Sequence, residues 1–558
     1  MKKFFCTLLS IFLAAILFPY GSIAAANGKN IEISATIDGR PIYFDVAPQK
    51  IDGRVMVPLR AIFESMGAEV EWEGSTETIR GKKEDIAVTL RLNDTTAVVS
   101  GKTVALDVAA TKMEGRTFVP ARFVAESFGA DVTWDNSRQQ VIISTGAAAP
   151  EGRYYFVYNS QKVTAQDLAS IKLFTNKFRS THNVLLDAAQ FKTAAAVYDA
   201  LNAEQKKLGG KVAGIQIFGP ASDVPSFSYV HKMKPTEGNF EWNGVEHNKV
   251  EKYVTDLFYS TFKNDSKYLK NDVTVYGIIQ ENLPISIVPE WPVSRLPLTK
   301  GEISKYIENY DSYRKQIQGK AVPTVALSAP YEIQDNIGQD DIAYLMKRMK
   351  AEDEFGYFGN TDLRIYYDHL AVNLEKENKS GVMDLVVGAD GGTEGAALKK
   401  SGKDYFLDRK SAASLNANYY TAFFWGMSAA KGLDVNSIIH DGMAKGKMIN
   451  PVALTVPTYN RDAVNYLWLP VPTPEGEEDG DWHDYVAVDK ELLKRDNPFF
   501  FVYKYYEAVE SGKTRLQSFH EAQTAYASLS VSNKKNLRAA IGYENVISLH
   551  YLGLADYE

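Results

Sequence analysis

Cysteine is almost absent from this chain of 558 residues, because Cys6 is the only one. Cys6 lies in an apolar stretch near the start, so the remainder of the chain can form neither disulfides nor thiolate metal sites. The remainder also has no cysteine nucleophile. Hydrophobic cores must therefore hold the fold together, and the length predicts two to four domains.

An excess of basic residues is also missing. The formal net charge is -7, and it becomes about -9 when Lys2 and Lys3 are removed with the first 26 residues. A mildly acidic chain is soluble, but its charge argues against nucleic acid or an anionic membrane as the main partner.

Long apolar runs are lacking except in residues 1–26. This segment has a dibasic start, a long apolar run and small residues at Ala24–Ala26, which is typical of a secretory signal peptide. No later stretch is long and apolar enough to form a transmembrane segment. We therefore expect an exported protein that is secreted or associated with the cell wall.

Histidine is scarce, and its spacing predicts no metal site. None of the eight histidines forms a His-x-His pair or an HExxH motif, so the sequence predicts neither a metal nor another cofactor. We interpret each histidine as a surface or structural residue, including His440 on an expected helix. Acidic residues gather at 473–485 without EF-hand spacing, which leaves calcium binding there open.

An internal repeat organises the N-terminal region. Residues 51–72 (IDGRVMVPLRAIFESMGAEVEW) match residues 113–134 (MEGRTFVPARFVAESFGADVTW) at eleven positions. Each copy predicts a turn, a short strand, a helix that begins near Pro58 or Pro120 and ends near Gly67 or Gly129, and then strands. The result is a duplicated α+β module at residues 30–145.

This repeated motif resembles the copper amine oxidase N-terminal-like domain, also called a stalk domain. The resemblance implies an extracellular spacer or adhesion module on cell-envelope proteins. It does not imply copper, because copper sites need clustered histidines and residues 30–145 contain none.

After a small-residue linker at 146–153, strand and helix patterns alternate. This β-α-β-α-β order predicts a mostly parallel sheet with helices on both faces, at residues 154–470. Sites in such sheets lie at the carboxyl ends of strands, which is where FGPASDVP (218–225) and VGADGGTEG (387–395) are expected. Residues 471–558 contain the acidic loop and an aromatic-rich, helical C-terminal extension.

The second region resembles the gingipain-type cysteine peptidases, which have a caspase-like α/β/α fold. The likeness rests on residues 212–227 and on the segment from Leu283 to Gln316, which contains Ser294-Arg295-Leu296-Pro297 and Thr299-Lys300-Gly301-Glu302. The overall fold class expected is therefore α/β: the small duplicated module followed by a caspase-like domain with a helical extension.

The resemblance also implies a catalytic dyad, and this chain lacks it. Asp390 stands where the family has its histidine, and Met427 or Ser428 stands where it has its cysteine. Aspartate ionises too low to replace the histidine base unless it is buried, and serine needs a strong base beside it. We therefore predict no catalytic residues.

The sequence favours a stalk module followed by a catalytically inactive peptidase-like domain that binds a cell-wall polymer or an extracellular protein. Two alternatives stay open. One is a secreted hydrolase with a non-cysteine site around Asp390, Glu394 and Ser428, and the other is a structural surface-layer or spore-coat component.

Overall fold

The computed structural model describes eighteen segments of the chain, which are residues 32–147, 152–230, 241–242, 245–246, 252–274, 282–317, 324–328, 363–366, 370–377, 383–388, 391–392, 395–397, 405–415, 419–425, 433, 436–454, 498–532 and 546–557. The expected signal peptide at 1–26 and the acidic loop at 473–485 lie outside these residues.

The N-terminal module contains two short helices and three small sheets. The sheets have the strand orders β12-β13-β1-β2, β10-β11-β4-β3 and β5-β6-β7-β8-β9. The elements are β1 (Ser34–Ile37), β2 (Arg40–Ile42), β3 (Gln49–Ile51), β4 (Arg54–Pro58), α1 (Leu59–Ser65), β5 (Glu69–Glu73), β6 (Thr78–Lys83), β7 (Ile86–Arg91), β8 (Thr96–Val99), β9 (Lys102–Ala105), β10 (Thr111–Met113), β11 (Arg116–Pro120), α2 (Ala121–Ser127), β12 (Asp131–Asp135) and β13 (Gln140–Ser144).

The two half-repeats meet around a pseudo-twofold axis. Strands β4 and β11 are antiparallel, and Val57 lies opposite Val119, its own repeat equivalent. The two proline residues are the N-caps of α1 and α2, as the sequence predicts. Gly67 and Gly129 follow the helices at φ +79° and +76°, a left-handed conformation that favours glycine at a helix end.

The second region is an α/β domain. Its helices are α3 (Ala165–Asn176), α4 (Ala194–Leu208), α6 (Ile303–Ile317), α8 (Leu370–Glu377), α9 (Arg409–Ala413), α10 (Ile438–Ala444), α12 (Pro498–Glu510) and α13 (Arg515–Ser532), with short 3-10 turns at Leu257–Ser260 and Ser266–Tyr268. No helix in the described segments is long and apolar enough to cross a membrane.

Ten strands of this domain form one sheet in the order β15-β14-β16-β22-β31-β30-β29-β25-β23-β24, and the others form small sheets beside it. The strands are β14 (Arg153–Tyr158), β15 (His182–Asp187), β16 (Val212–Phe218), β17 (Phe227–Val230), β18 (Glu241–Trp242), β19 (Val245–Glu246), β20 (Lys252–Thr255), β21 (Val273–Thr274), β22 (Val293–Leu296), β23 (Thr324–Ser328), β24 (Leu363–Tyr366), β25 (Met383–Gly388), β26 (Gly391–Gly392), β27 (Gly395–Ala397), β28 (Tyr405–Asp408), β29 (Tyr419–Trp425), β30 (Val452–Leu454) and β31 (Leu549–Leu552).

The large sheet has two parallel halves that run in opposite directions. Strands β15, β14, β16, β22 and β31 are parallel to one another, and so are β30, β29, β25, β23 and β24. The halves join at the antiparallel pair β30–β31. The mostly parallel α/β sheet expected from the sequence is confirmed. The strand order is also the same in each half when it is read from the outer edge of the sheet inward. The order is β15-β14-β16-β22 in the first half and β24-β23-β25-β29 in the second.

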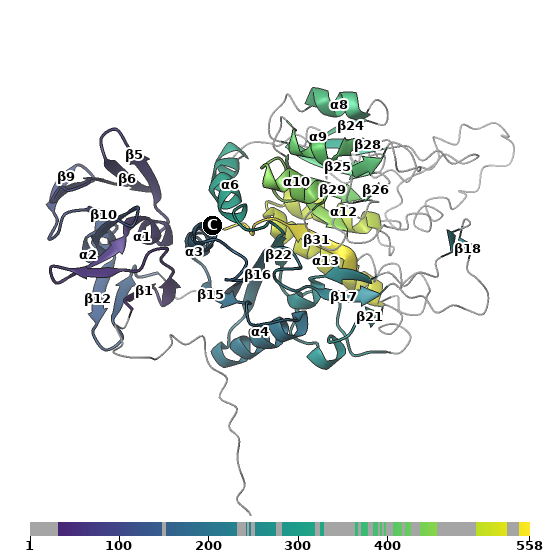
Figure 1. Ribbon diagram of the computed structural model, residues 1–558, viewed down its shortest axis with the longest axis horizontal. Helices are drawn as coiled ribbons and strands as arrows, with labels where there is room; N and C mark the ends of the chain where they lie inside the picture. Colours follow the sequence, from purple (N-terminus) through teal and green to yellow (C-terminus); the bar gives the residue numbers. More distant parts are fainter. Residues whose placement is uncertain are drawn as a thin grey trace, which may run out of the picture.

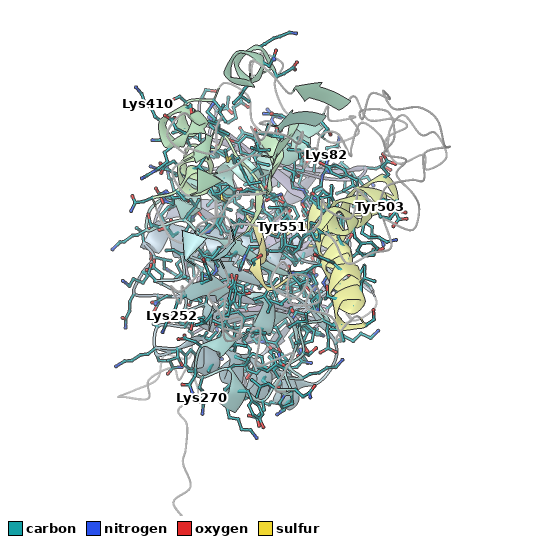
Figure 2. All side chains as sticks on the ribbon, turned by 90° about the vertical axis from the view of Figure 1, so that its right-hand side faces the viewer. Lys82, Lys252, Lys270, Lys410, Tyr503 and Tyr551 are labelled. Carbon is teal, nitrogen blue, oxygen red and sulfur yellow. The ribbon has the colours of Figure 1, made fainter. Side chains whose placement is uncertain are left out.

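The middle of the sheet is completed by the C-terminal region. Helices α12 and α13 are the helices predicted there, but a strand that was not predicted, β31, follows them. Tyr551 pairs with Ser294 of β22 on one side and with Val452 of β30 on the other. Figure 1 shows α12, α13 and β31 together inside the domain, and Figure 2 shows Tyr551 at its centre. This region is therefore part of the sheet as well as a helical layer.

The N-terminal module packs against α3 and β15 of the α/β domain (Figure 1). The backbone N–H of Tyr43 donates to Asn176 Oδ1 (2.9 Å), and Asn176 Nδ2 donates to the Tyr43 carbonyl (2.8 Å). The Tyr43 hydroxyl donates to the carbonyl of Asn183 (2.9 Å). Leu173 of α3 packs against the core of the module. The two parts are thus joined by paired polar groups as well as by an apolar contact.

A polar cluster lies at the same interface, formed by Glu64 of α1, Lys177, Asp311, Arg314 and Tyr557. Lys177 forms an ion pair with Asp311, which also accepts a hydrogen bond from the Tyr557 hydroxyl. Arg314 stacks over the Tyr557 ring at 4.0 Å. Glu64 Oε2 is buried and has no hydrogen-bond partner among the described residues. This interface cluster brings together the module, α3, α6 and the C-terminal segment.

Candidate functional site

The positions that correspond to the peptidase dyad, Asp390, Met427 and Ser428, lie outside the described residues, as does Glu394. The strands that precede them are described. Strands β25 and β29 are parallel neighbours, and Gly388 pairs with Trp425 at their carboxyl ends. The two strands therefore end side by side, at Gly388 and Trp425.

The glycine-rich stretch after β25 contains more regular structure than a loop. Gly391–Gly392 (β26) pairs with Gly395–Ala397 (β27), which pairs in turn with β28. Glycine and alanine give no hydrophobic alternation, so the sequence pattern does not reveal these strands. The loop expected at 387–395 is partly a β-hairpin.

The other loop expected at a strand end follows β16, and it is fixed by Arg295. This side chain is only 1% exposed. Its Nη1 donates to the carbonyls of Gly219 (2.8 Å) and Val224 (2.9 Å), while Nε and Nη2 donate to the two oxygens of Asp256 (2.6 and 2.8 Å). All these partners are internal, so Arg295 holds the loop in place instead of facing a ligand.

His550 completes this buried network as a neutral imidazole. Its Nε2 accepts a hydrogen bond from the Asp256 backbone N–H (3.1 Å), and its Nδ1 lies 2.7 Å from the Ser548 carbonyl. Only the tautomer that carries its proton on Nδ1 satisfies both contacts. Burial lowers the pKa of His550, in keeping with the neutral form.

An open cleft between α6, α9 and α10 is lined by a group of ionisable side chains. Its volume is about 750 Å³. The lining residues are Glu302, Lys305, Asp408, Arg409, Lys410, Ala413, His440, Asp441, Ala444 and Lys445. Eight of the ten side chains are ionisable and the other two are alanines, so the cleft is lined almost entirely by ionisable groups.

Helix capping places the charged groups of the cleft. The Glu302 carboxylate precedes α6 and accepts hydrogen bonds from the Thr299 backbone N–H (2.9 Å) and hydroxyl (2.7 Å). The Asp408 side chain caps α9 in a reciprocal pair with Ser411. Ser437 caps α10 by accepting a hydrogen bond from the backbone N–H of His440 (3.0 Å). The three groups lie at the starts of the three helices that surround the cleft.

His440 lies between two carboxylates on the cleft wall. Its Nε2 is 3.1 Å from Glu302 Oε2 and its Nδ1 is 3.1 Å from Asp441 Oδ1. Asp441 also forms an ion pair with Arg409 (2.6 Å). Because carboxylates only accept hydrogen bonds, both contacts are satisfied only when both ring nitrogens carry protons, which favours the imidazolium form of His440.

The pKa directions agree with this geometry. Burial alone lowers the pKa of His440, but its hydrogen bonds to Glu302 and Asp441 outweigh burial and raise it. Burial alone raises the pKa of Glu302, but hydrogen bonds from His440 and Thr299 lower it to about 2. A histidine with both nitrogens occupied cannot take a proton, so it is not available as a general base.

Sequence reasoning interpreted His440 as structural and did not connect it with Glu302. The Thr299–Glu302 capping pattern was visible, but the contact joins residues 138 positions apart. No group of three or more histidine, cysteine or acidic side chains that could hold a metal ion occurs in the described segments.

Comparison with known proteins identifies the N-terminal region. Residues 36–143 match the copper amine oxidase N-terminal domain family, which confirms the stalk-domain resemblance. A comparison with curated protein sequences found no match.

Three solved structures similar to the chain concern proteases. A structure titled as a protease is 14% identical, covers 72% of this chain and 77% of its own, and has a TM-score of 0.44. The Arg-specific cysteine proteinase gingipain R is 13% identical, with coverage of 72% and 77% and a TM-score of 0.42. A complex of the pro- and mature domains of RgpB from Porphyromonas gingivalis is 12% identical, with coverage of 72% and 78% and a TM-score of 0.43. The chain thus carries a copper amine oxidase N-terminal domain, followed by an α/β domain with gingipains among its structural neighbours.

Proposed function

We propose that this protein is exported to the cell envelope, where its peptidase-like domain binds a ligand and does not cleave peptides. The observation that carries the proposal is the position of the only cysteine, at residue 6 within the expected signal peptide. Once that segment is removed, no thiolate is left to attack a peptide carbonyl.

The cleft supports a binding role. Its ten lining residues include no serine, threonine, cysteine or tyrosine, and its histidine is held by two carboxylates. The three lysines in the cleft, Lys305, Lys410 and Lys445, are exposed. Charged groups fixed by helix caps and ion pairs suit recognition better than bond cleavage.

The docked N-terminal module fits the same role. The expected stalk domain is attached to the α/β domain by hydrogen bonds through Tyr43 and Asn176. A module packed in this way presents the α/β domain in a fixed orientation relative to whatever the module contacts. We infer a cell-wall polymer or an extracellular protein as the partner.

The test is a peptide-library cleavage assay on the chain without residues 1–26, with and without calcium. A thiol-dependent peptidase assayed in parallel shows that the library and conditions report cleavage. We expect no turnover. Reproducible turnover that resists thiol reagents and is lost in Ser428→Ala or Asp390→Ala would overturn the proposal in favour of a non-cysteine hydrolase.

A second measurement addresses the structural alternative. Size-exclusion chromatography and electron microscopy of the same protein are expected to show discrete particles. Ordered self-assembly into sheets would overturn the binding role in favour of a surface-layer or spore-coat component.

A further inference from the structure

We infer that the cleft between α6, α9 and α10 binds an anionic polymer of the poly(alditol phosphate) class through Lys305, Lys410 and Lys445. This inference rests on the proposed binding function and specifies the ligand. It starts from the way the charges of the cleft are distributed.

Every carboxylate in the cleft is already engaged within the protein. Glu302 accepts from Thr299 and contacts His440, Asp408 caps α9, and Asp441 is shared by His440 and Arg409. Each acidic side chain is thus held by hydrogen bonds or an ion pair within the protein, so none of them is left to contact a cation of a ligand.

The three lysines are in the opposite situation. Lys305, Lys410 and Lys445 line the cleft and are exposed, and none of them has an ion-pair partner in the described part of the chain. With the His440 imidazolium and Arg409, the lining has five cations against three carboxylates. The chain as a whole carries -7, so the cleft is locally positive on an acidic protein.

The type of cation favours phosphate over carboxylate ligands. Arginine recognises planar carboxylates by a two-pronged contact, but the Arg409 guanidinium is held by Asp441 at 2.6 Å. The lysine ammonium groups are mobile point charges, which bind phosphates well without a fixed fork geometry.

The lining also lacks the aromatic rings that two other kinds of polymer use. Single-stranded nucleic acids are bound by stacking of bases on aromatic rings, and the cleft lining contains none. Ring stacking with sugars is absent for the same reason. A flexible backbone of phosphodiesters joined by small polyols needs only separate cations along an open cleft, which is what the lysines provide.

The test compares two triple variants of the chain without residues 1–26. One is Lys305→Gln, Lys410→Gln and Lys445→Gln. The control is Lys82→Gln, Lys102→Gln and Lys270→Gln, which changes the net charge equally at exposed positions outside the cleft. Figure 2 shows Lys410 far from Lys270 on the molecule. Thermal unfolding checks that both variants are folded.

Binding of poly(glycerol phosphate) is measured by calorimetry at several salt concentrations. The cleft variant is expected to bind about 10-fold more weakly, because three exposed ion pairs with phosphate are lost and each contributes only modestly. Its dependence of log affinity on log salt should be shallower by about two to three units, because each phosphate contact releases a counterion. The control variant should keep the affinity and slope of the unsubstituted protein.

Poly-glutamate and oligodeoxythymidylate serve as comparison polymers. Equal affinity for either one, or equal weakening by the two triple variants, would overturn the inference. Failure to bind the polymer without any peptide turnover would overturn this inference and leave the non-hydrolytic proposal standing. Lysine-dependent binding together with peptide turnover would support this inference and overturn the proposal that the domain does not cleave peptides.

Discussion

Glu64 is expected to make the docking of the N-terminal module depend on pH. Burial raises the pKa of this carboxyl from 4.5 to about 7, against the attraction of Lys177 and Arg60. Asp311 and Asp45 also face it and raise its pKa further. The docked state therefore binds a proton that an undocked, solvated Glu64 would release at neutral pH.

The sign and size of the effect follow from proton linkage. Since the docked pKa is the higher one, the stabilisation is complete below about pH 4.5 and is lost as the pH rises through about 7. The full shift corresponds to about 3 kcal/mol, of which about 2.5 kcal/mol is lost between about pH 5 and pH 8. Glu64→Gln removes this titration and keeps the shape of the protonated acid.

The repeat supplies a matched control. Glu126 is the equivalent of Glu64 in the second half-repeat, but it is exposed and lies 3.8 Å from Arg122. Glu126→Gln should change stability by less than about 1 kcal/mol at any pH. His182 titrates near the same interface, with its pKa lowered by burial and by Arg153. His182 is present in the unsubstituted protein and in both variants, so its contribution to the pH dependence cancels when they are compared.

The assay is hydrogen exchange of the α1 and α3 amides, converted to opening free energies at each pH. From about pH 5 to pH 8 the unsubstituted protein and Glu126→Gln should both lose about 2.5 kcal/mol more protection than Glu64→Gln does. Parallel pH profiles for all three proteins would refute the reasoning, because they would mean that Glu64 is not buried on docking.

Two further predictions concern ion pairs. Arg295→Gln should destabilise the α/β domain by about 3–5 kcal/mol, because it leaves the buried Asp256 carboxylate unpaired. Arg54→Gln breaks an exposed contact of the same 2.6 Å length and should cost less than about 1 kcal/mol, so equal costs in urea unfolding would contradict the burial argument. Glu302→Gln should lower the pKa of His440, which NMR titration of the ring measures. In the unsubstituted protein, the stabilisation from protonated His440 is complete below about pH 6.5. It is lost as the pH rises through the raised pKa of His440. An unchanged pKa in that variant would show that Asp441 alone holds the imidazolium.

Local patterns in the sequence were sufficient to predict much of the fold. The repeat located both short helices through Pro58 and Pro120, because proline is tolerated at a helix start. Thr164, a residue type that favours the N-cap position, precedes α3 and forms a capping box with Asp167. These signals are contained within a few consecutive residues, so they can be read without the tertiary structure.

The features that were missed depend on distant contacts. Strand β31 has four residues, all buried, so it shows no alternation and resembles the helical pattern that precedes it. The cleft depends on the contact between His440 and Glu302, which nothing local indicates. Single histidines and glutamates are common, and only the packing of α6 against α10 makes these two a pair.

The position of β31 has a consequence for how the chain reaches its native state. During synthesis, Ser294 of β22 has no strand neighbour until Tyr551 of β31 has been added. The same holds for the hydrogen bond from Gln216 Nε2 to the carbonyl of Gly553, which joins residues 337 positions apart. Contacts of such high sequence separation slow folding, and unpaired strand edges promote aggregation. The two halves of the sheet can each form as the chain emerges, but their joining is postponed to a late step. A truncated or stalled chain would therefore expose two open sheet edges in its interior, and it would depend on chaperones until the last strand closed the gap.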